Sequence, residues 1–354
     1  MPVVKRSLVF LAFIAALAAT RPAEAATCPF NIPVVTIPPH TVDGFTWSGP
    51  IRPFGDACIE TIEVDPANDN AWYAGSPNGL YMTKNAGLTW TMPIAGFVKV
   101  ITLLPGSPTL VYAGVGNDLY LSRDNGLNWT IIHSFPKNVY SVLASGGRLF
   151  VGLGWDNHVN PSGIYVSNLG GGFMTFHPFG PGQTGLIVWT LARDPLSGIV
   201  FAGTEIFDHP QPYHPPYFRS TDNGVSWMDV SGSTINWHVV ASAVRPQDGL
   251  VYALTEGFGT YRSSDFGATW QPPVLSPGLG CGLKMDPNLP TRLYAGTQMF
   301  GTVSGGVYRS TNSAKTFWSI GMQGVTVCDI ALNGSSTRIY VAAYGSGIYR
   351  ATVP

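Results

Sequence analysis

The chain has 354 residues, a formal net charge of −1 and only 11% charged residues. Proteins that bind nucleic acids carry clustered lysine and arginine, so this composition argues against a nucleic-acid partner. With 42 glycines, 29 prolines and 12% aromatic residues, the chain is predicted to be a turn-rich all-β protein rather than a helical one.

The first 26 residues have the layout of a cleaved secretory signal. Two basic residues precede an apolar run at 8–19, and an Ala-Glu-Ala sequence ends at Ala25. This run is shorter than the ~20 residues that a membrane-spanning helix needs. We therefore expect a signal peptide at 1–26, a Pro-rich tail at 27–41, and a secreted or periplasmic chain with no membrane insertion after cleavage.

Four cysteines, Cys28, Cys58, Cys281 and Cys328, follow the signal. An even number of cysteines in an exported chain favours disulfides. Three pairings are open. We predict Cys28–Cys58, which would tie down the N-terminal tail, and Cys281–Cys328, which would join two repeats.

The rest of the chain repeats a unit of about 40 to 50 residues, a spacing typical of propeller blades. Each copy reads as an apolar strand, a "VYAG"-like strand, a "GLYxS"-like strand, a short motif and a strand led by tryptophan. The first copy occupies 58–92. About seven copies occur, and the last, at 325–352, lacks the short motif.

The short motif, which we call the turn box, has the form Ser-x-Asp-x-Gly-x-Ser/Thr-Trp, as in "STDNGVSW" from Ser220 to Trp227. Glycine would supply a positive φ in a tight hairpin. The serine and aspartate would fold back onto the turn amides, and the tryptophan would be buried beside the neighbouring blade. We predict these structural roles for Gly87, Trp90, Asp124, Gly126, Trp129, Asp222, Gly224, Trp227, Asp265, Gly267 and Trp270.

The turn box resembles the Asp-box, or BNR, repeat. The resemblance covers nearly all of the chain after the signal. It implies a β-propeller of the kind shared by sialidases, xyloglucanases, the sortilin luminal domain and photosystem II assembly factors. Because these relatives differ in activity, the resemblance implies the fold and little about function.

The last repeat lacks an outer strand, whereas the segment "VDGFTWSG" at 42–49 precedes the first repeat without a partner. Pairing the two closes the ring and removes an open sheet edge. The sequence therefore predicts a single seven-bladed β-propeller at 42–354, with four-stranded antiparallel blades and a ring closed by the N-terminal strand.

Function is expected on the face opposite the box hairpins, where loops join the second and third strands of each blade. Three of these loops are long, at 154–163, 204–218 and 297–306, and the first two lie on adjacent blades. A sugar or a peptide would meet aromatic rings and polar groups there. The predicted ligand-binding residues are Trp155, His158, Trp189, His209, Tyr213, His214, Trp237 and His238.

Two kinds of chemistry could use the same rim. Asp156 with Glu205 or Asp208 would supply the carboxylate pair of a glycoside hydrolase. Asp208, His209 and His214 are acceptable metal ligands, but they show no recognised spacing. We therefore predict neither a metal nor another cofactor.

The resemblance to sialidases would require arginines that converge on a substrate carboxylate. Here Arg219, Arg262 and Arg309 recur at a fixed place before the box, so they belong to the repeat. A single exported propeller is more similar to the photosystem II assembly factors, in which an arginine patch contacts a client protein. The same three arginines would form that patch, although Met82 and Leu121 interrupt it.

We therefore expect an exported, non-catalytic binding or assembly scaffold that uses its loop-rich face to bind an extracellular glycan or protein partner. The alternative is a glycoside hydrolase or lyase acting on an extracellular polysaccharide.

Overall fold

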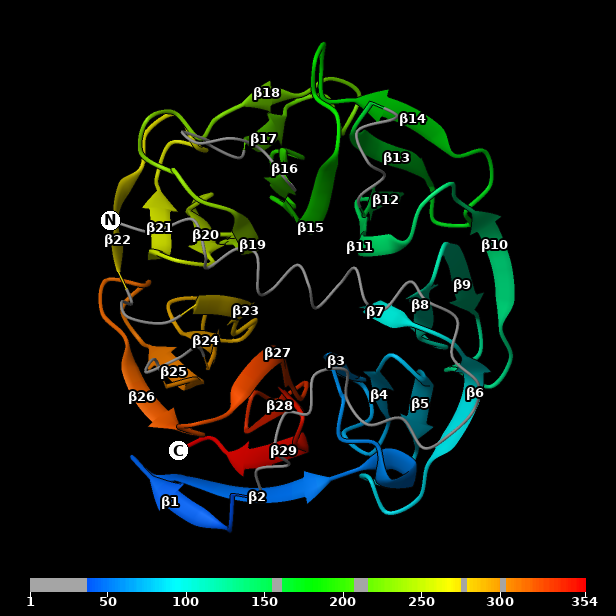
Figure 1. Cartoon of the computed structure of the whole chain (residues 1–354), viewed down its shortest axis with the longest axis vertical. Coiled ribbons are helices and arrows are strands. Elements are labelled where there is room, and N and C mark those ends of the chain that lie inside the picture. The colour runs from blue at the N-terminus through cyan, green and yellow to red at the C-terminus, as the bar shows by residue number, and fades with distance from the viewer. Residues whose placement is uncertain (1–36, 155–160, 207–215, 275–278, 300–303) are drawn as a thin grey trace.

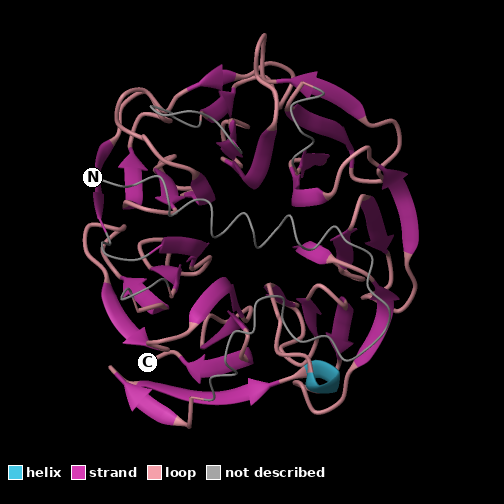
Figure 2. Cartoon of the chain, viewed as in Figure 1, coloured by secondary structure: helices cyan, strands magenta, loops and turns pink. Residues whose placement is uncertain are grey.

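The computed structural model describes residues 37–154, 161–206, 216–274, 279–299 and 304–354. Seven antiparallel sheets form a ring around a central axis (Figure 1). Across these ranges the only helical segment is the single turn η2 (Pro53–Gly55), seen in Figure 2. None of the helical structure in them is long and apolar enough to span a membrane. The predicted seven-bladed, all-β propeller is confirmed.

Each blade is a sheet of consecutive antiparallel strands, with its first strand nearest the axis. Blades 1 and 2 consist of β3 (Thr61–Val64), β4 (Trp72–Gly75), β5 (Gly79–Thr83) and β6 (Thr91–Ala95), then β7 (Val98–Leu104), β8 (Leu110–Val115), β9 (Asp118–Ser122) and β10 (Thr130–Ser134). Blades 3 and 4 consist of β11 (Val139–Ser145), β12 (Arg148–Leu153), β13 (Gly163–Asn168) and β14 (Thr175–Pro178), then β15 (Leu186–Arg193), β16 (Val200–Ile206), β17 (Tyr217–Ser220) and β18 (Met228–Asp229). Blades 5 and 6 consist of β19 (Val239–Val244), β20 (Val251–Thr255), β21 (Gly259–Ser263) and β22 (Gln271–Val274), then β23 (Leu279–Met285), β24 (Leu293–Gln298), β25 (Gly306–Ser310) and β26 (Trp318–Gly321).

Blade 7 joins the two ends of the chain. Its first three strands are β27 (Thr326–Leu332), β28 (Arg338–Tyr344) and β29 (Gly347–Thr352), and its fourth is β2 (Phe45–Ile51). The pairing of β2 with β29 confirms the predicted closure. The sheet also extends further than expected, because β1 (His40–Val42) adds a fifth strand within the segment predicted to be a tail.

Trp47 fixes the closing strand to the neighbouring blade. Its side chain is 1% exposed, and its indole N–H donates a 2.7 Å hydrogen bond to the carbonyl of Ile320 in blade 6. Phe45, from the same strand, is also fully buried in this cluster. The closure is thus held by apolar burial as well as by the strand ladder.

Replacing Trp47 with alanine should therefore lower the free energy of unfolding by about 3–5 kcal/mol, as truncation of a large core aromatic does. Chemical denaturation would measure the loss. Trp318→Ala is the control, because Trp318 is only partly buried against the same cluster and should cost less. Equal losses in the two variants would contradict a special role for the closing strand.

The turn boxes hold their hairpins by internal hydrogen bonds. In blade 4, Ser220 Oγ donates to Asp222 Oδ1 at 2.8 Å and accepts from the Gly224 amide at 2.8 Å. Asp222 in turn accepts from the amide and the hydroxyl of Ser226, at 2.9 and 2.5 Å. Gly224 has a φ of +88°, and a Cβ there would lie 2.9 Å from Phe150. Side-chain caps and a left-handed backbone thus define the turn.

The box tryptophans are less buried than the sequence suggested. Trp90, Trp129, Trp227 and Trp270 are each only partly buried, although each packs against the core cluster shared with the preceding blade. Their place at the outer edge of the blade leaves one side of the ring system in solvent. Apart from Phe45 and Trp47 on the closing strand, the fully buried large aromatics lie on the second and third strands of their blades, as Trp72 does on β4.

The repeated arginines connect neighbouring blades. Arg219 donates to the carbonyl of Phe266 at 2.8 Å, and Arg262 donates to the carbonyl of Ser313 at 3.0 Å. Each acceptor lies in the turn box of the next blade. Blade 7 has no box, and there Arg309 contacts Asp43 at 3.6 Å instead. These guanidinium groups are therefore used within the ring.

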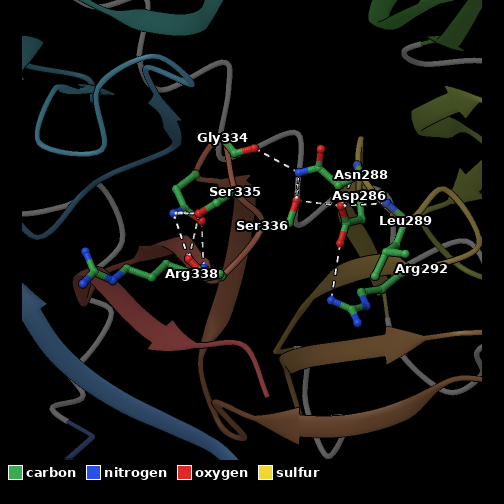
Figure 3. Close-up of polar contacts among 10 residues, drawn as sticks. Asp286, Asn288, Leu289, Arg292, Gly334, Ser335, Ser336 and Arg338 are labelled. Carbon is green, nitrogen blue, oxygen red and sulfur yellow. Dashed lines mark hydrogen bonds and ion pairs between the residues drawn. The ribbon is translucent and has the colours of Figure 1, made fainter.

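A second set of contacts joins the turns between first and second strands. Asp286 is fully buried, and its carboxylate accepts from the amides of Asn288 and Leu289 and from Ser336 of the next blade, at 2.9, 3.2 and 2.6 Å (Figure 3). Arg292 lies 3.4 Å from its other oxygen. Buried carboxylates of this kind lock adjacent blades in register.

The box carboxylates should make stability depend on pH. Hydrogen bonds from the side chain and the amide of Ser226 lower the pKa of Asp222 from 3.8 to about 2. The charged form therefore stabilises the fold fully above pH 3.8, and this contribution is lost as the pH falls towards 2. We expect Asp222→Ala to lower the melting temperature at pH 7. The difference in melting temperature between this variant and the native chain should become smaller between pH 4 and pH 3.

Asp222→Asn is the matched control for that measurement. Asn85 and Asn312 occupy the same place in two other boxes and accept the equivalent amide hydrogen bonds, at 2.9 and 3.0 Å. The asparagine variant should therefore melt closer to the native chain at pH 7. If the difference in melting temperature between Asp222→Ala and the native chain does not change with pH, the ionised Asp222 carboxylate does not stabilise the turn box.

Candidate functional site: the central channel and its rim

The innermost strands share a β-bulge near their starts. In six blades the pairing of the first and second strands slips by one residue at the same point. A bulge leaves the extra residue unpaired and redirects its side chain. The bulged residues are Lys99, Tyr140, Trp189, Val240, Cys281 and Cys328, and Glu60 holds the same place just ahead of β3. We call these seven residues the bulge ring.

All members of the bulge ring line one cavity of about 250 Å³ on the axis of the propeller. The backbone geometry is the same from blade to blade, but the side chains differ. Equivalent backbone positions thus place seven side chains, which differ in chemistry, around one cavity.

Neighbours in the bulge ring contact one another. Lys99 Nζ lies 2.9 Å from Glu60 Oε2 and 5.1 Å from the centre of the Trp189 ring. Tyr140 meets Trp189 edge to face, with ring centres 5.2 Å apart. Burial alone would lower the pKa of Lys99, but the Glu60 carboxylate outweighs it and raises that pKa above its usual value. Lys99 therefore stays charged and paired.

A second ion pair lies beside the cavity, and one of its partners, Glu63, belongs to the cavity lining. Lys284 Nζ is 3.1 and 3.3 Å from the two oxygens of Glu63. Asp329, close by, accepts from the hydroxyl of Thr61 at 2.8 Å and from the amide of Ile62 at 3.0 Å. Burial raises the pKa of Glu63 and of Asp329, and Lys284 opposes this for both. Both lysines are thus paired with a glutamate at or next to β3.

The predicted Cys281–Cys328 disulfide is not formed in the structure. Both residues are free thiols. They occupy bulge positions on β23 and β27, which are adjacent inner strands, and their side chains are hydrogen-bonded to each other. The sequence thus predicted the neighbourhood but not the state of the sulfurs. The Cys28–Cys58 pairing stays a prediction, since Cys28 lies outside the described residues.

Alkylation after denaturation without reductant should label both Cys281 and Cys328, and peptide mapping would show it. In the native state Cys328 should react slowly at pH 8, because the hydrogen bond to Cys281 and burial raise the pKa of its thiol. Cys281→Ala is the control, since it removes that hydrogen bond and should speed the reaction. Absence of labelling in the denatured chain would show that the disulfide forms after all.

Beside the bulge ring, three buried side chains converge between blades 4 and 5. Glu205, His238 and Glu256 are 1%, 5% and 3% exposed, and one ligand atom from each lies within 4.8 Å of the others. Glu205 is the next-to-last residue of the second strand of blade 4, Glu256 follows that of blade 5, and His238 precedes the inner strand of blade 5. We call this group the Glu-His-Glu cluster.

The cluster has a defined geometry. His238 Nδ1 lies 3.0 Å from Glu205 Oε1 and 4.0 Å from Glu256 Oε2. Burial alone would lower the pKa of His238, but the two carboxylates raise it above its ordinary value. Burial and the charge of Glu205 raise the pKa of Glu256 to about 7, with His238 opposing them.

The structure places only some of the predicted rim residues. Trp155, Asp156, His158, Asp208, His209, Tyr213 and His214 lie outside the described residues. Trp189 belongs to the bulge ring, and its indole N–H donates to Glu205 Oε2 at 2.5 Å. Trp237 stacks on His238 with ring centres 5.4 Å apart. Glu205, a candidate catalytic residue, is buried and held by neighbouring side chains.

Several residues of the site were missed from the sequence. Five bulged side chains directly follow a valine that begins or nearly begins an inner strand, at Lys99, Tyr140, Trp189, Val240 and Cys328. An alignment of the repeats on that valine would have identified these five residues as equivalent positions. Glu256 was missed because its loop is short, although Thr204-Glu205 and Thr255-Glu256 repeat the same dipeptide at the end of a second strand.

Comparison with known proteins gives the fold. No protein-family model matches the chain, and no curated protein matches it in sequence. Among solved structures, YCF48 bound to D1 peptide aligns with a TM-score of 0.59 and 17% identity over 84% of this chain and 94% of that one. An ancestral GH74 enzyme aligns with a TM-score of 0.66 and 16% identity over 89% of this chain, but only 46% of its own.

A third structure, the extracellular domain of a putative hybrid two-component system from B. thetaiotaomicron, aligns with a TM-score of 0.64 and 15% identity over 88% of this chain and 39% of that one. At such identities these likenesses define a class of fold and no activity. The chain is a seven-bladed β-propeller, and these neighbours share that fold.

Proposed function

We propose that this propeller is an exported, non-catalytic scaffold that binds a peptide segment or a polypeptide end in its central channel, at the bulge ring. The carrying observation is the shared cavity of about 250 Å³ that the seven residues of the bulge ring line. Backbone bulges repeated at one level of the channel form a preorganised wall, and rigid sites bind with less loss of entropy.

The lining favours an uncharged, apolar ligand. Phe97, Tyr140, Trp189, Val240 and Tyr344 contribute apolar or aromatic surface to the cavity. Lys99, the lysine that lines the cavity, is already neutralised by Glu60. A highly charged ligand would have to break this largely buried pair, which is costly. An apolar or aromatic side chain, or a chain end that carries one, can bind without breaking an ion pair.

The size of the cavity also favours this choice. Pockets that enclose a drug-sized ligand measure roughly 300–1,000 Å³, and this cavity is slightly smaller. It suits one or two side chains better than an oligosaccharide. YCF48, a neighbour in fold, has been solved with a bound D1 peptide, which supports a peptide as the class of ligand.

The surface proposed here differs from the arginine patch considered from sequence. Arg219 and Arg262 donate to backbone carbonyls of the next blade, and Arg309 lies against Asp43. Using them for a client would require breaking contacts that hold the ring together. A ligand bound in the channel would leave these arginine contacts intact.

The hydrolase alternative has weaker support. Glu205 is 1% exposed, and Trp189 and His238 contact its two oxygens, so it is poorly placed to reach a substrate. The other carboxylates proposed for this role, Asp156 and Asp208, lie outside the described residues. The likeness to a GH74 enzyme covers less than half of that chain.

The test is selection of a displayed random peptide library on the chain from residue 27 onwards, followed by affinity measurements on a plugged variant. Val240→Trp should fill the channel and weaken binding of selected peptides at least tenfold. Val225→Trp is the matched control, because Val225 lies in a turn box and is 50% exposed. The control should bind as the native chain does.

The selected peptides should be rich in apolar and aromatic residues, and both variants should melt close to the native temperature. Equal binding by the plugged variant would show that the channel is not the site. Failure to enrich any peptide, together with depolymerisation of a polysaccharide by the same preparation, would replace the scaffold with the hydrolase.

A further inference from the structure

We propose that the Glu-His-Glu cluster, formed by Glu205, His238 and Glu256, is a binding site for one divalent transition-metal ion of the zinc type. This goes beyond the peptide-binding function and does not depend on it. The site joins blades 4 and 5 at the rim of the channel, and all three ligands come from the ends of strands or next to them.

The donor atoms fit such an ion in kind. Zinc binds imidazole nitrogen and carboxylate oxygen, and three protein ligands with a fourth place for water are a common arrangement. Metal–ligand bonds of about 2.1 Å at tetrahedral angles place two donors about 3.4 Å apart. The observed 3.0 and 4.0 Å from His238 Nδ1 to the two carboxylates lie on either side of that distance.

The direction of the donors is a separate observation. His238 Nδ1 and Glu205 Oε1 are 3.0 Å apart, yet neither has a hydrogen-bond partner of acceptable geometry among the described residues. The oxygen therefore lies away from the line along which the ring nitrogen would donate. When Nδ1 is unprotonated, this close but poorly aligned pair leaves a lone pair on each atom for a third centre.

The charge of the cluster suits a dication. With His238 neutral, as a metal ligand is, the two ionised carboxylates would carry a charge of −2 in a buried place, and burying such charge without a cation is strongly unfavourable. No arginine or lysine is paired with Glu205 or Glu256 among the described residues. A dication would neutralise both carboxylates at once.

The surroundings of the cluster resemble an outer coordination shell. Metal-binding carboxylates are usually held by a further hydrogen bond, whose loss lowers metal affinity about 10–100-fold. Trp189 supplies such a bond, since its indole N–H donates to Glu205 Oε2 and leaves Oε1 facing His238. Trp189 is thus a positioning residue for the metal as well as a member of the bulge ring.

The experiment is titration of the chelator-treated full chain with Zn²⁺ by calorimetry, together with melting curves. We expect one equivalent that Glu256→Gln weakens at least tenfold and that Trp189→Phe weakens 10–100-fold. Bound Zn²⁺ should raise the melting temperature of the native chain, since a ligand that binds the folded state stabilises it. His177→Gln, which removes a histidine far along blade 3, is the control and should bind as the native chain does.

Cobalt gives a second readout that does not depend on stability. Co²⁺ at the site should produce visible absorption bands whose shape changes in Trp189→Phe, because Glu205 would lose its fixed orientation. Zn²⁺ binding of equal strength in Glu256→Gln would place the metal elsewhere and overturn the proposal. The same holds if the native chain binds no Zn²⁺ and its melting temperature is unaffected, which would leave the cluster as a histidine between two carboxylates.

Discussion

The pairing of β2 with β29 is the constraint on which the rest of the molecule depends. Every other blade is covered on both sides by blades next to it in the chain, but blade 7 and blade 1 can meet only if the ends of the chain are joined. The ladder from Thr46 to Ile51 supplies the missing strand, and Trp47 anchors it in blade 6. Closure fixes the spacing of the inner strands, and so determines whether the bulged residues meet around one cavity.

Structural and functional positions are separated within each repeat. The turn boxes, the arginines before them and the buried aspartates of the inner turns repeat from blade to blade, and each is engaged in a hydrogen bond within the ring. The bulge position repeats only in backbone shape. Its occupants, from Glu60 and Lys99 to Trp189 and Cys328, are chemically different. A propeller can vary this position without losing its hairpins, so recognition is most easily built there.

The sequence predicted what depends on local periodicity. Turn residues, strand alternation and the orphan segment at 42–49 were enough to infer seven blades and their closure. A bulge is less visible, because one extra residue in a strand changes the direction of a side chain without changing the composition of the strand. Lys99 and Tyr140 were therefore not identified as site residues from the sequence.

The state of the cysteines and the Glu-His-Glu cluster were unpredictable for another reason. Both depend on how neighbouring blades sit against each other in space. Cys281 and Cys328 come from different repeats, as do Glu205 and Glu256. The repeated Thr-Glu dipeptide indicated that two carboxylates lie at equivalent places, but only the packing of blades 4 and 5 brings His238 between them.

Trp189 connects the two parts of the site. One edge of its indole donates to Glu205, while the ring contacts Tyr140 and lies under Lys99. Any group that fixes Glu205 therefore also restricts one wall of the channel, and a ligand packed against that wall restricts Glu205. Ligands that order the same side chain each reduce the entropy that the other must lose. The geometry thus favours positive coupling between the rim and the channel, carried by a single hydrogen bond. A substitution at Trp189 would therefore affect both the proposed metal site and the proposed peptide site, whereas one at Val240 would affect the channel alone.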